Sequence, residues 1–124
     1  MDIFTTFSQN GKFLNKDFAY LEWHEHPSFE GVELKHLITA ADSGGLFSYH
    51  LVRIAPGKVI SNHIHETQLE THEVISGTGR CLNDGRETLY TPGVISLFPA
   101  GIKHEVHANS AGLCLFAKFI PALC

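Results

Sequence analysis

Histidine is the residue type in this chain whose number and spacing point to chemistry. The sequence contains nine histidines, and His63 and His65 are separated by a single residue. Alternate side chains of a β-strand point to the same face, so these two imidazoles would lie side by side on a strand. Because imidazole is the commonest protein ligand of transition metals, this spacing predicts a metal site.

Two more residues complete a plausible ligand set. A turn at residues 66–68 would bring the next strand back antiparallel and place Glu70 opposite the two imidazoles. His104 follows the Pro99-Ala100-Gly101 turn and is the best candidate for a fourth ligand. Three neutral imidazoles and one carboxylate would leave a divalent ion positively charged, with open positions for substrate or water. We therefore expect one divalent transition metal to be held by His63, His65, Glu70 and His104.

His72 is the candidate catalytic residue. It lies two positions after Glu70, and a regular strand would place both side chains on the same face. A buried imidazole near a cation resists protonation, which suits a general base. A structural hydrogen bond from His72 to a metal ligand is an equally good account, and both roles stay open.

Other charged and histidine residues have less specific patterns. His24 and His26 repeat the His-x-His spacing, but no matching carboxylate and glycine follow, so we expect them on an exposed arm. In the strand predicted at 46–54, Tyr49 and Arg53 share one face and His50 shares the other with Val52. If Arg53 faced the barrel interior, it would indicate an anionic substrate; otherwise it is a surface residue.

Short strands must position these residues. From Gly31 onward, apolar or alternating runs are separated by Gly, Pro, Asn and Asp, which is typical of all-β sandwiches and barrels. The predicted strands cover residues 32–38, 46–54, 59–65, 69–76, 79–83, 87–90, 94–98, 105–108 and 113–119. We expect residues 31–124 to form one β-barrel. Residues 1–30 should form an arm packed on the barrel or on a partner subunit.

The candidate ligands lie in two motifs that resemble those of the cupin superfamily. The first family motif is Gly, five residues, His-x-His, three or four residues, Glu, six residues and Gly. It is matched here by Gly57, His63, His65, Glu70 and Gly77. The second motif is matched by Gly93, Pro99, Gly101 and His104. Ala108 departs from it, because the family has asparagine there, which puts the end of that strand in doubt.

The resemblance implies a fold and a cofactor. The fold would be an all-β, double-stranded β-helix or jelly-roll cupin barrel, and the cofactor one divalent transition metal: Fe, Mn, Ni or Zn. Related cupins include enzymes of the dioxygenase, isomerase and lyase types, and also non-catalytic modules that bind sugars or effectors. We expect a metal-dependent enzyme acting on a small molecule, with the binding module as the alternative, and a homodimer.

Composition excludes other classes of function. The 124 residues are 44% hydrophobic and 18% charged, which is typical of a packed globular domain. The net charge is −4 and the nine Lys and Arg are scattered, so no nucleic-acid partner is expected. No targeting segment or long apolar run indicates a membrane. Because Cys81, Cys114 and Cys124 form no Cys-x-x-Cys pair, we interpret them as reduced thiols of a soluble, cytoplasmic protein.

Overall fold

The computed structural model describes residues 2–124. Its helices are α1 (Ile3–Asn10), the short 3-10 helix η1 (Phe18–Tyr20) and α2 (Ala40–Ser43). Its strands are β1 (Lys12–Phe13), β2 (Lys16–Asp17), β3 (His24–Glu25), β4 (Val32–Ile38), β5 (Ser48–Ile54), β6 (Val59–His63), β7 (Leu69–Asn83), β8 (Arg86–Tyr90), β9 (Ile95–Phe98) and β10 (His104–Ile120). Within residues 2–124, no helix combines the length and apolar character needed to cross a membrane.

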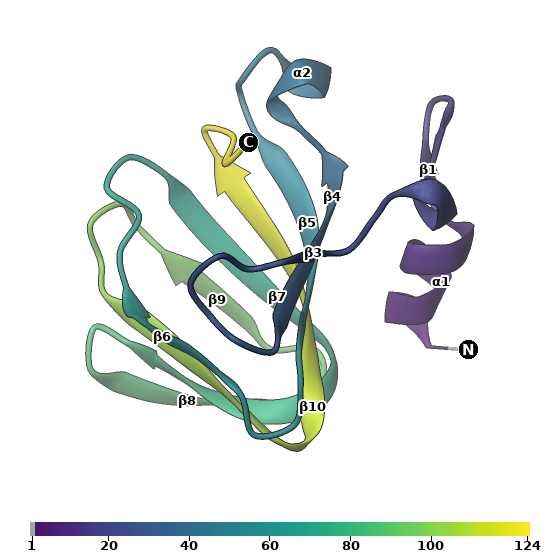
Figure 1. The fold of residues 1–124 in the computed structure, drawn as a ribbon. Coiled ribbons are helices and arrows are strands. Elements are labelled where there is room, and N and C mark those ends of the chain that lie inside the picture. Colours follow the sequence, from purple (N-terminus) through teal and green to yellow (C-terminus); the bar gives the residue numbers. More distant parts are fainter. Residues whose placement is uncertain (1) are drawn as a thin grey trace.

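The long strands β7 and β10 run through both layers of the barrel (Figure 1). Residues 113–120 of β10 pair with residues 69–77 of β7 and join β3, β4, β5 and β9 in one layer. Residues 104–108 of β10 pair with residues 79–83 of β7 and join β6 and β8 in the other layer. This antiparallel arrangement confirms the predicted all-β jelly-roll barrel.

Two strand breaks predicted from glycines are wrong. The segments 69–76 and 79–83 are one strand, β7, and 105–108 and 113–119 are one strand, β10. Gly77 has φ +79°, and a Cβ there would lie 2.1 Å from the carbonyl oxygen of Gly112. A Cβ on Gly79 would lie equally close, 2.1 Å, to the carbonyl oxygen of His107. The glycines therefore let the two strands bend past each other in contact, where no side chain would fit.

The burial of side chains on β5 shows which of its faces lines the barrel. His50 and Val52 are buried with 0% and 4% exposure, and Val52 belongs to the inner apolar core. Arg53 faces outward, where its Nε donates to Glu33 Oε1 at 2.9 Å and its guanidinium stacks 3.9 Å from the Trp23 ring centre. The surface interpretation of Arg53 is therefore correct, and Arg53 provides no anion-binding group inside the barrel.

Most of the arm, within residues 2–23, packs on the outer face of the β4–β5 layer. β3 pairs with β4, and a second apolar cluster joins the arm to the sheet. Its buried members are Phe4, Phe18, Leu37, Leu51 and Phe116. The buried Lys35 of β4 reaches out to the arm, and its Nζ donates to the carbonyl oxygens of Ser8 and Phe18 at 2.9 and 2.8 Å. These contacts fix the arm against its own barrel.

Candidate metal centre

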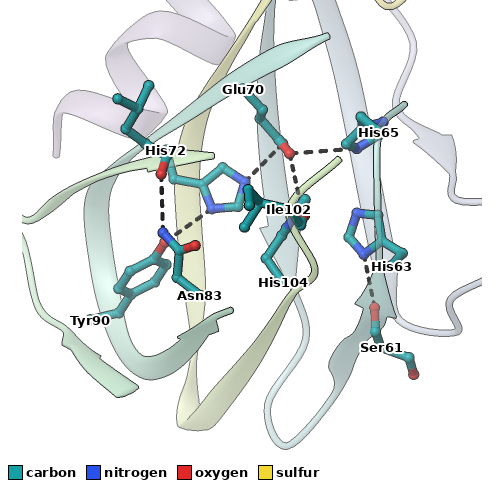
Figure 2. A network of polar contacts seen from close by, with 10 residues as sticks. Ser61, His63, His65, Glu70, His72, Asn83, Tyr90, Ile102 and His104 are labelled. Atoms are coloured by element: carbon teal, nitrogen blue, oxygen red, sulfur yellow. Dashed lines mark hydrogen bonds and ion pairs between the residues drawn. The ribbon is translucent and has the colours of Figure 1, made fainter. Parts of the chain in front are cut away.

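The structure brings His63, His65, Glu70 and His104 together at one end of the barrel (Figure 2). One ligand atom from each residue lies within 4.8 Å of those of the others. His63 ends β6 and is paired directly with His104, which begins β10. His65 lies beyond the end of β6, so the strand predicted to reach it stops two residues short. Its carbonyl oxygen accepts from Gly101 N–H at 2.9 Å, which ties the two ligand-bearing loops together.

Backbone carbonyls orient two of the imidazoles. His63 Nδ1 lies 2.8 Å from the carbonyl oxygen of Ser61, and His104 Nδ1 lies 3.1 Å from that of Ile102. A carbonyl only accepts, so Nδ1 carries a hydrogen in both rings, and in the neutral imidazole each Nε2 keeps its lone pair. Metal ligands of proteins are commonly oriented in this way.

Two buried atoms at the centre of the cluster have no hydrogen-bond partner among the described residues: Glu70 Oε1 and His104 Nε2. They are 3.0 Å apart, and His65 Nε2 lies 3.5 Å from the same carboxylate oxygen. Because the hydrogen of His104 is on Nδ1, the short contact brings two lone pairs together and is not a hydrogen bond. Burying such a pair is costly unless a cation lies between them, so the donor set fits a metal ion.

The charge states of the ligands also suit a cation. Burial by itself raises the pKa of Glu70, but the neighbouring imidazoles, that of His72 foremost, hold that pKa well below its usual range. Burial lowers the pKa of His63 to about 4, and burial also lowers the pKa of His65. At neutral pH the site therefore combines an ionised carboxylate at Glu70 with neutral imidazoles at His63 and His65.

His72 contacts Glu70 and does not belong to the four-residue cluster. Its side chain is 3% exposed, and its Nε2 lies 2.9 Å from Glu70 Oε2 while its Nδ1 lies 3.1 Å from the Tyr90 hydroxyl (Figure 2). His107 bonds Glu105 Oε2 at 2.7 Å and lies outside the cluster. The contacts of His72 thus orient the carboxylate of Glu70.

A cavity of about 90 Å³ opens beside the ligands. It is bordered by His63, His65, Glu70 and His72, and also by His26 of the arm and Leu123 near the C-terminus. The expectation that His26 lies on an exposed arm is wrong: it is half-buried and stacks on Phe29 at 4.4 Å. Apart from its own His-x-His spacing, no signal in the sequence indicated His26, and none indicated Leu123.

Known structures with the same architecture include several proteins of similar size. KdgF from a Halomonas species matches with TM-score 0.74 and 19% identity over 89% of this chain and 92% of that one. A predicted oxalate decarboxylase from Thermotoga maritima matches with TM-score 0.72 and 20% identity over 83% of this chain and 95% of that one. An RmlC-like cupin from Shewanella frigidimarina matches with TM-score 0.73 and 18% identity over 85% and 87% of the two chains. At these identities the likeness shows the fold.

The sequence comparisons give the family. No curated protein matches the chain. The family model described as the cupin domain matches residues 50–117, which is more than half of the 124 residues and includes the four clustered side chains. The chain therefore belongs to the cupin family.

Proposed function

We propose that this cupin binds one divalent transition metal through His63, His65, Glu70 and His104 and acts on a small molecule in the adjoining cavity. The observation that supports this most directly is the buried, unpartnered pair of Glu70 Oε1 and His104 Nε2 at 3.0 Å. When bound, Fe, Mn, Ni or Zn would supply Lewis acidity or, for iron, oxygen activation.

The chain's own residues define what the site would accept. A cavity of about 90 Å³ is small beside the several hundred Å³ typical of drug-sized ligands, which favours a compact substrate. His26 adds an imidazole and Leu123 an apolar side chain to the wall. His72 holds Glu70 in place through its 2.9 Å contact, and we give it this positioning role in preference to a catalytic one.

Structural relatives support an enzymatic role. Among the proteins with this fold are a predicted oxalate decarboxylase, the polyketide cyclase RemF from Streptomyces resistomycificus and an ectoine synthase from P. lautus. A dioxygenase, isomerase or lyase activity on a small oxygen-rich substrate is the function that the site supports best. The alternative is a non-catalytic module that binds a sugar or effector in the same cavity.

Two measurements test the proposal. Elemental analysis of protein purified without an affinity tag should find a transition metal that is depleted in the Glu70→Gln variant. The protein loaded in turn with Fe, Mn, Ni and Zn should then be assayed against diols, keto-sugars and thiols. Turnover with one metal is expected. Ligand-induced stabilisation without product would instead support the binding module, and wild-type protein that retains no metal would contradict the site.

We also propose a cytoplasmic homodimer. The outer face of the barrel carries a groove of about 590 Å³ bordered by the exposed Leu46, Ile95 and Ile120. A dimer would cover these apolar side chains. A single sedimenting species of monomer mass at micromolar concentration would contradict it.

A further inference from the structure

A second cluster of metal-binding side chains lies apart from the candidate metal centre. It consists of His36, His50 and Cys124, whose ligand atoms lie within 4.8 Å of one another. His36 of β4 and His50 of β5 are directly opposite in the ladder, and their Nδ1 atoms are 2.7 Å apart. The ring of Phe119 separates the clusters, with its centre 5.5 Å from that of His50 and 5.1 Å from that of His65.

Hydrogen bonds hold residues 122–124 beside this histidine pair. Ala122 N–H donates to Gly45 O at 3.1 Å, Leu123 N–H to Ser48 Oγ at 2.8 Å, and Ala40 N–H to Cys124 O at 2.6 Å. Figure 1 shows this end of the chain next to β5. The backbone that carries the sulfur is thus held by residues 40–48, and little backbone ordering remains to be done on metal binding.

The histidine pair has the chemistry of two ligands. His50 is 0% exposed, and its Nε2 bonds Ser48 Oγ at 2.7 Å, which fixes the ring. Two Nδ1 atoms at 2.7 Å share a single hydrogen, so one of them presents a lone pair to the other. Burial, helped by the neighbouring His36, lowers the pKa of His50 to about 3, and burial also lowers the pKa of His36. Both rings are therefore neutral, as ligation requires.

We propose that His36, His50 and Cys124 form a second metal site, selective for a thiophilic ion of the Zn²⁺ type. One sulfur and two imidazole nitrogens are a ligand set that favours such ions over Mg²⁺ or Ca²⁺. Binding releases one proton, from the Cys124 thiol. The ring that holds the shared hydrogen moves it from Nδ1 to its own Nε2, so that both Nδ1 atoms face the ion. The bound ion carries one net positive charge and has a fourth position open.

Cobalt(II) distinguishes the two sites, because it replaces Zn²⁺ and only a sulfur ligand gives a thiolate-to-cobalt charge-transfer band. The candidate metal centre contains no sulfur. We expect the reduced full-length protein to bind two Co²⁺ per chain, of which only one contributes to the charge-transfer band. Cys124→Ser should abolish the band and lower the stoichiometry by one. Cys114→Ser, which changes a half-buried cysteine outside the cluster, should leave both unchanged.

The charge-transfer band of the second site does not depend on the candidate metal centre. Glu70→Gln should remove the other equivalent of cobalt and preserve the charge-transfer band. His36→Gln should weaken the Co²⁺ affinity measured by the band at least tenfold. The proposal is overturned if saturating Co²⁺ gives no band, or if the band persists in Cys124→Ser.

Discussion

The contribution of Glu70 to metal binding can be measured as thermal stability. We expect Mn²⁺ to report on the candidate metal centre alone, because Mn²⁺ prefers carboxylate and imidazole to sulfur. At 100 times its dissociation constant, a bound ligand stabilises the native state by about 2.7 kcal/mol. Unfolding entropy of about 2.1 cal/mol/K per residue over 124 residues is about 0.26 kcal/mol/K, so the melting temperature should rise by about 10 °C.

The substitution Glu70→Gln should remove most of that rise. Loss of the charged ligand is expected to weaken Mn²⁺ binding at least about 100-fold, which at the same Mn²⁺ concentration leaves a stabilisation of at most about 0.4 kcal/mol, or under about 2 °C. The metal-free variant should melt within about 4 °C of the wild type, because glutamine keeps the shape and can still accept from His72.

Differential scanning fluorimetry with and without Mn²⁺ measures both quantities. Glu66→Gln is the matched control, because Glu66 lies in the loop just before β7, is exposed and lies outside the ligand cluster. It should keep the whole 10 °C rise expected of the wild type. If Glu70→Gln keeps a rise close to that of the wild type, Glu70 is not a ligand and the reasoning from its unpartnered oxygen is refuted.

Three further outcomes follow from the same geometry. Since burial lowers the pKa of His63 to about 4, its imidazole should stay neutral at pH 5, so an NMR titration of the metal-free protein between pH 7.5 and pH 5 should show little change in the His63 ring nitrogens. A midpoint near the ordinary value of about 6.5 would contradict that burial effect. His72→Leu should weaken metal binding about 10- to 100-fold, because leucine cannot hydrogen-bond to Glu70. His72→Gln should weaken it much less, because glutamine can still donate to Glu70. Equal metal affinities of the two variants would exclude the positioning role. Gly77→Ala should lower the free energy of unfolding measured in urea by about 3 kcal/mol, and Gly85→Ala should lower it by about 1 kcal/mol. Both glycines have positive φ, but only Gly77 lies against another strand. Equal losses of stability in the two variants would disprove the close contact between β7 and β10 at Gly77.

Local sequence patterns were sufficient for the class of fold and for the candidate ligands. Strand β4 was predicted with its observed bounds, Val32–Ile38, because alternation and flanking turn residues act over a few neighbours. The spacing of His63, His65 and Glu70 is equally local. The antiparallel hairpin expected to carry them is wrong, because β6 and the part of β7 that carries Glu70 lie in different layers and each pairs with β10. His104 was predicted from its place just after the Pro99-Ala100-Gly101 turn of the second motif, and the structure places it against His63.

Only the tertiary structure decided features that depend on distant segments. Glycines mark strand ends in a linear reading, yet Gly77 lies within β7 because the backbone of β10 passes it in contact. Leu123 reaches Ser48 across 75 positions, and that contact brings Cys124 to the buried His50 and the half-buried His36. His26 likewise reaches the cavity through the pairing of β3 with β4. The sequence by itself determined which residues could bind a metal, because residue type and short spacing are local properties. Which of them meet was decided by long-range strand pairing, which no local pattern encodes.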